Sequence, residues 1–201
     1  MKLLEKDCAG EGLQVHYYEN GLKAIQGTLL NGRREGLWME WYPCGTKKEE
    51  VFYLNDLFHG KLSVWYDNDR KAYRSWWSNG SLHGTYSRWY RSGQIQFAGR
   101  YEEDHIFSDI GWKPNGERSE TKVREGSGLM VDYYEIGQKE AERVFRNGKL
   151  VCSRGWDLEG EPNESMVEDG EGYDLVTYPD GSRVMEVYEL GEVVDLIPVD
   201  S

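Results

Sequence analysis

The sequence has few cysteines and no long hydrophobic run. Its 201 residues include three cysteines, Cys8, Cys44 and Cys152, an odd number without paired spacing. Such cysteines are typical of free thiols in a reducing compartment. No stretch approaches the roughly 18 apolar residues of a membrane span, and the charged segment 1–7 is too short for a secretory signal. We therefore expect a cytoplasmic protein.

The sequence also lacks the motifs of the common enzyme classes. It contains no Gly-x-Ser-x-Gly nucleophile elbow, no phosphate-binding loop and no dinucleotide fingerprint. Of its four histidines, His59 and His83 each precede a glycine, and no third metal ligand stands at a recognisable spacing from them. The sequence therefore predicts a protein that is not an enzyme and that binds no cofactor and no metal.

Basic residues are almost absent from the last quarter of the chain. The whole sequence has 24 basic and 36 acidic residues, a net charge of −12, but residues 152–201 hold only Arg154 and Arg183 against fourteen acids. Such a field repels nucleic acid and anionic membranes and attracts a basic protein surface. Two interpretations remain open: a binding surface, or a solvated acidic edge that keeps sheets from stacking. The acids lack the spacing of a calcium loop.

What the sequence does contain is a repeat of 24 residues. Its copies open at Gly12, Gly36, Gly60 and Gly84, and each opening glycine is followed six positions later by a tyrosine. Each copy has two turn signals separated by runs rich in Trp, Tyr, Val and Ile, the composition of short strands. Such a period is typical of stacked supersecondary units. The sequence thus predicts an all-β fold: an elongated single-sheet antiparallel β-meander of tandem β-hairpin repeats.

The repeat continues less regularly towards the C-terminus. Copies open at Gly128 and Gly172, and two segments that look truncated, 111–116 and 155–160, keep a turn glycine and an aromatic residue four positions before it. We count eight units, four regular and four degenerate. Degenerate units are expected at the end of a stack, because an end unit must cap it. The predicted organisation is an N-terminal cap (1–11), four regular repeats (12–107), four degenerate repeats (108–192) with an acidic region (157–174), and a C-terminal tail (193–201).

Two neighbouring positions of the repeat are aromatic. One holds tyrosine in six copies, at Tyr18, Tyr42, Tyr66, Tyr90, Tyr134 and Tyr178. The other, one residue earlier, is aromatic at Tyr17, Trp41, Trp65, Trp89 and Tyr133 and, in the truncated units, at Trp112 and Trp156. Because adjacent strand residues point to opposite faces, each face is expected to carry a ladder of stacked rings. The alternative is a platform on which sugars or bases stack.

The whole unit can be written as Tyr-x-x-x-Gly, a strand, Asn-Gly, a short loop, and Gly-x-x-x-x-Trp/Tyr-Tyr. This pattern resembles the MORN-repeat variant, and more closely the bacterial YwqK-like antitoxin family, over about residues 12–192. The resemblance implies a meandering antiparallel sheet that curls into a trough. It also implies an immunity or antitoxin protein that neutralises a cognate toxin by direct protein–protein binding.

The acidic region supplies a hypothesis for the binding surface. Toxins that act on nucleic acid carry basic clefts, and an acidic surface would accelerate encounter with such a cleft. We expect the partner to be a toxin with a basic active-site surface, not nucleic acid and not a membrane. Rival interpretations are a repeat scaffold that organises other cellular proteins and an aromatic-lined glycan binder. The predicted contact residues are Trp156 as an aromatic anchor and, as steering charges, Asp157, Glu159, Glu161, Glu164, Glu168, Asp169, Glu171 and Asp174.

Overall fold

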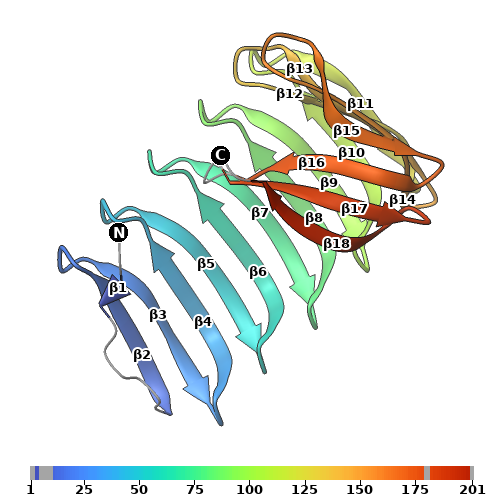
Figure 1. Ribbon diagram of the computed structural model, residues 1–201. Helices are drawn as coiled ribbons and strands as arrows, with labels where there is room; N and C mark the ends of the chain where they lie inside the picture. The colour runs from blue at the N-terminus through green and yellow to red at the C-terminus, as the bar shows by residue number, and fades with distance from the viewer. Residues whose placement is uncertain (1–2, 5–10, 179–181, 200–201) are drawn as a thin grey trace.

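The protein is one antiparallel sheet in which each strand pairs with the next along the chain (Figure 1). The computed structural model describes residues 3–4, 11–178 and 182–199, so Cys8 and most of the predicted cap lie outside the described residues. The predicted all-β meander of consecutive hairpins is confirmed. The described residues include no helix that could reach across a membrane. The strands are β1 (Leu3–Leu4), β2 (Gly12–Tyr18), β3 (Lys23–Leu30), β4 (Arg33–Trp41), β5 (Lys47–Leu54), β6 (Leu57–Trp65), β7 (Lys71–Ser78), β8 (Ser81–Trp89), β9 (Ile95–Glu102), β10 (His105–Trp112), β11 (Arg118–Arg124), β12 (Ser127–Tyr133), β13 (Lys139–Arg146), β14 (Lys149–Trp156), β15 (Pro162–Glu168), β16 (Glu171–Thr177), β17 (Arg183–Glu189) and β18 (Glu192–Val199).

The repeated turn residues take the left-handed backbone conformation that tight hairpins need. Asn31, Asn55 and Asn79 have φ between 50° and 53°, a region that asparagine enters at lower cost than most residues. Asp69 stands where the other regular repeats have glycine and keeps the turn with φ of 65°. The local chemistry of the turns therefore sets the hairpin register.

The repeated tyrosines join each repeat to the next through their hydroxyl groups. Tyr42 donates to the carbonyl of Trp65 at 2.7 Å, and Tyr66 donates to that of Trp89 at 2.8 Å. Tyr18, Tyr90 and Tyr134 make the same bond one repeat onward. The predicted ladder of rings at these positions is wrong: ring contacts in the described part of the chain run instead through Trp38, Tyr53, Phe58 and Trp77, and through Tyr73, Tyr86 and Tyr101.

The tyrosine bonds can be tested at the most buried of these positions. Tyr90 is 2% exposed, and its hydroxyl lies 2.9 Å from the carbonyl oxygen of Trp112. We expect Tyr90→Phe to lower the free energy of unfolding by about 1–2 kcal/mol, because it leaves a buried carbonyl without that donor. Urea denaturation measures this loss. Tyr173→Phe is the control, because Tyr173 is 50% exposed; an equal loss there would contradict the role of the bond.

The repeat shortens in the C-terminal half. Strands β4, β6 and β8 begin 24 residues apart, whereas β10, β12, β14 and β16 begin 22 residues apart. In β6, the three residues 59–61 lie opposite the single residue Phe52, forming a bulge around Gly60, whose φ is 80°. The β11–β12 and β15–β16 pairs have no such bulge. The segments 111–116 and 155–160 are therefore not truncated units but parts of the complete hairpins β10–β11 and β14–β15.

The two halves of the sheet differ in shape. Strands β2–β7, here called the open half, lie side by side in a gently curved sheet, whereas β8–β18, the closed half, roll up so that β16–β18 return towards β7–β9 (Figure 1). Strand β18 extends the sheet to Val199, through residues that the sequence assigns to a tail. Hydrogen bonds join successive turns, from Gly148 N to Gly126 O at 2.8 Å and from Gly191 N to Gly170 O at 3.0 Å, and a bond of 3.2 Å from Leu150 N to Gly191 O closes that end of the roll.

Candidate functional site

The face of the sheet that lines the roll, here called the inner face, runs without interruption into the open half. Strand register places Trp38, Val51, Leu62, Ser75 and Tyr86 in one row across five strands. Tyr86 lies inside the roll, so the row connects the two halves. Each repeat contributes the third and fifth residues of its opening segment to this face, because strand residues alternate between faces.

In the open half the inner face is lined by aromatic rings. The ring centroids of Trp38 and Tyr53 lie 6.2 Å apart, those of Tyr53 and Phe58 lie 5.1 Å apart, and those of Phe58 and Trp77 lie 5.0 Å apart. The Trp38 indole lies across Gly27, where a Cβ atom would meet it at 2.0 Å. No described element lies over the inner face of β3–β6 (Figure 1). These rings form one cluster, here called the trough, in which Val51, Tyr53 and Leu62 are buried and Trp38, Phe58 and Trp77 are partly exposed.

Two carboxylates face each other in this trough. Glu40 of β4 and Glu49 of β5 are direct cross-strand partners, an arrangement of like charges that destabilises a sheet. Burial raises the pKa of Glu49, and the charge of Glu40 raises it further. Within the described residues, neither carboxylate forms an ion pair, while the nearby Arg34 stacks on Tyr53 and pairs with Asp56 at 3.1 Å. The open half therefore holds an opposed pair of carboxylates beside aromatic rings, and the charges of Lys48 and Arg34 offset the repulsion at Glu49 only in part.

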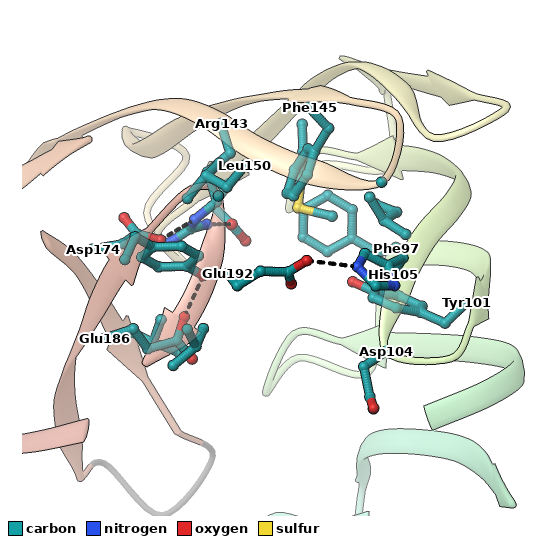
Figure 2. Close-up of a pocket in the computed structure, with 18 of the residues that line it drawn as sticks. Phe97, Tyr101, Asp104, His105, Arg143, Phe145, Leu150, Asp174, Glu186 and Glu192 are labelled. Atoms are coloured by element: carbon teal, nitrogen blue, oxygen red, sulfur yellow. Dashed lines mark hydrogen bonds and ion pairs between the residues drawn. The ribbon is translucent and has the colours of Figure 1, made fainter. Parts of the chain in front are cut away.

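The closed half contains a cavity of about 310 Å³ that is partly open to solvent. Figure 2 shows Arg143 and Asp174 on one wall and Phe97 and Tyr101 on the other. A hydrogen bond of 3.0 Å between the His105 ring and the Glu192 carboxylate joins the two walls at the rim. Strands from opposite ends of the roll thus form a single chamber.

A network of buried charges forms part of the cavity wall. The Arg143 guanidinium contacts the carboxylates of both Asp132 and Asp174. Ser153 donates to Asp174 at 2.5 Å, and Gln96 donates to Asp132 at 3.2 Å. Burial alone would lower the pKa of Arg143, but Asp174 and Asp132 hold it well above its ordinary value. Two carboxylates thus share one guanidinium, so the loss of Arg143 alone would be costly.

Other charged groups in the same cavity are less well compensated. Burial raises the pKa of Glu140, and the Asp132 carboxylate raises it further. Burial also raises the pKa of Glu186, whose carboxylate accepts a hydrogen bond of 2.6 Å from Tyr188. Arg88 lies 3.6 Å from Asp132, at the outer limit of an ion pair. The cavity therefore has a surplus of carboxylates.

The predicted contact residues do not form one surface. Asp157, Glu159 and Glu161 lie in and beside the turn between β14 and β15, and a second set lies at the opposite ends of the strands, beside the β15–β16 turn. Strand β15 has seven residues and separates these turns by about 20 Å. The second set, beside the β15–β16 turn, consists of Glu168, Asp169 and Glu171. Glu164 lies between the two turns, on the outer face of β15.

Two of the predicted residues have structural contacts of their own. The prediction that Asp174 steers a partner is wrong, because its side chain is fully buried and bound by Arg143 and Ser153. Asp174 is the third residue of its opening segment, which points inward. Trp156 is half-buried, with the Lys139 ammonium 5.8 Å from its ring centroid, and its carbonyl accepts from Tyr134.

The inner-face residues could not be recognised from the constant positions of the repeat, because they lie at its variable positions. Opening glycines and tyrosines recur, whereas the third and fifth residues change from one repeat to the next. Variation at fixed inward positions of a constant framework is the signal that could have found them. The inward pairs are Gln14 and His16, Trp38 and Glu40, Leu62 and Val64, Tyr86 and Arg88, Met130 and Asp132, and Asp174 and Val176.

Within the part of the chain that the structure describes, no three His, Cys, Asp or Glu side chains converge as they would around a metal ion. No protein-family model matches this chain, and no curated protein matches it either. The resemblance to the MORN-repeat variant and to the YwqK-like antitoxins therefore stays a prediction from the sequence.

Proposed function

We propose that this protein is an immunity or antitoxin protein that neutralises a cognate toxin by binding it, and that the inner face of the open half is the contact surface. The observation that carries the proposal is the pair of opposed carboxylates, Glu40 and Glu49, between the rings of the trough. Their mutual repulsion costs stability, and a cation brought by a partner would relieve it.

The chemistry of the trough fits an extended basic segment of the partner. Aromatic faces attract the ammonium and guanidinium groups of Lys and Arg, and the trough already holds one such contact, in which Arg34 lies 4.0 Å from the Tyr53 ring centroid. The net charge of −12 would accelerate encounter with a basic toxin. A trough contact would place the toxin's basic surface against the sheet and so block it.

The experiment is affinity capture of the tagged protein from its source cells, followed by an activity assay of the captured partner. We expect one stoichiometric basic protein whose activity is lost in the complex and returns on dissociation. Several substoichiometric partners with unchanged activity would favour the scaffold function instead. Quenching of tryptophan fluorescence by a soluble glycan, without any protein partner, would favour glycan binding.

A further inference from the structure

The cavity of the closed half has an unbalanced set of charges. Two guanidinium groups, those of Arg88 and Arg143, line it together with the His105 ring and six carboxylates, those of Asp104, Asp132, Asp174, Glu140, Glu186 and Glu192. Glu192 is paired with His105 and Lys149. Arg143 is engaged by Asp132 and Asp174. Among the described residues Glu140 and Glu186 form no such close ion pair, and the charges of Arg88 and Arg143 act on Glu140, and that of Arg143 on Glu186, from a greater distance. Uncompensated charge in a sheltered site is costly, so a ligand of opposite sign would gain from entering.

The walls between these carboxylates are aromatic. Tyr86, Phe97, Tyr101 and Tyr188 line the same cavity, and the rings of Tyr86 and Tyr101 meet edge to face with their centroids 5.4 Å apart. Aromatic faces combined with carboxylates are the usual recognition elements for organic cations. A cavity of about 310 Å³ is at the lower end of the range for small-molecule sites, about 300–1,000 Å³.

The geometry excludes a bare metal ion as the best occupant. Among the described residues no three carboxylate, histidine or cysteine side chains come together, whereas a divalent metal needs several converging oxygen ligands. Carboxylates spread over separate strands suit a longer cation that reaches more than one of them. Glu140 comes from β13 and Glu186 from β17.

We propose that this cavity binds a small aliphatic amine in its protonated form, held by Glu140 and Glu186 and by the surrounding tyrosine and phenylalanine rings. The bound amine compensates the two surplus carboxylates and bridges β13 and β17. This inference concerns the closed half and does not depend on the toxin proposed for the open half.

Isothermal titration of the full-length protein with 1,4-diaminobutane tests the proposal. We expect saturable binding at one site, no binding of 1,4-butanediol, which has the same length without charge, and no binding of Mg²⁺. Glu186→Gln is expected to weaken diamine binding at least about tenfold, because one buried charge contact is lost. Glu164→Gln, which makes the same charge change on the outer face, is expected to leave the affinity within about twofold.

Three outcomes would overturn the proposal. Equal heats for the diamine and the diol would mean that the cavity carboxylates are balanced by protons alone. An equal loss of affinity in Glu164→Gln would assign the effect to the overall charge of the protein. Competition by Mg²⁺ at equal concentration would indicate non-specific cation screening. The comparison of diamine with diol uses the unaltered protein, so the test stands even if a variant fails to fold.

Discussion

Replacing Arg143 with methionine is expected to lower the free energy of unfolding of the closed half by about 3–5 kcal/mol. The Arg143 side chain is 13% exposed and contacts both Asp132 and Asp174. Without the guanidinium these carboxylates face each other in a site from which water is largely excluded. Native-state hydrogen exchange of β12–β17 amides measures the loss region by region.

A compensating variant separates charge from packing. Asp132→Asn and Asp174→Asn, added to Arg143→Met, remove the carboxylates that the single substitution leaves uncompensated. We expect the triple variant to recover at least half of the lost stability, because complete removal of a buried charge network is often close to neutral. If the triple variant is no more stable than Arg143→Met alone, the network contributes through shape and not through charge.

Replacing Asp109 with asparagine is expected to stabilise the protein near pH 7 by about 2–4 kcal/mol. Burial raises the pKa of Asp109 from its ordinary value of 3.8 to about 8. Its side chain is 1% exposed, and one carboxylate oxygen has no partner among the described residues. The folded protein must therefore hold a proton that the unfolded chain releases, and each pH unit between the two pKa values costs about 1.4 kcal/mol.

The sign of this effect follows from the raised pKa. The folded state binds more protons than the unfolded state, so the stability of the unaltered protein falls as pH rises from about 4 to about 8. The advantage of Asp109→Asn should vanish near pH 4 and grow towards pH 8, as measured by urea denaturation across that range. Glu117→Gln, at an exposed turn position, is the control. A difference that stays constant with pH would contradict a buried, protonated Asp109.

The hairpins were predictable because their signals are local. Asn55 and Asn79 each take a positive φ, and such residues mark turns wherever they recur at a fixed spacing. The change of spacing to 22 residues is also present in the sequence, in the turn pairs Glu125-Gly126, Asn147-Gly148 and Asp169-Gly170. It was missed because aromatic residues, and not turns, guided the alignment of the later units.

The roll and its cavity could not be predicted in the same way. Arg88 bonds to the carbonyl of Thr177, 89 residues away, and His105 pairs with Glu192, 87 residues away. No local pattern encodes such distances. The misassignment of Asp174 has a different cause, because its neighbours in the sequence are acidic while its position in the strand points inward. Charge density along the chain does not distinguish the two faces of a strand.

The most direct test of the proposed function compares two pairs of neutralised carboxylates against the captured partner. Glu40→Gln with Glu49→Gln removes the opposed charges of the trough, and Glu164→Gln with Glu168→Gln removes the same number from the outer face. We expect the trough variant to be more stable in isolation by about 0.5–1 kcal/mol, since a like-charge pair is relieved. It should bind the partner about tenfold to a hundredfold more weakly, through faster dissociation.

The outer-face variant should change only the association rate at low salt. If the outer-face variant instead loses the affinity while the trough variant binds as tightly as the unaltered protein, the contact surface is the acidic outer face and the account of the trough is wrong.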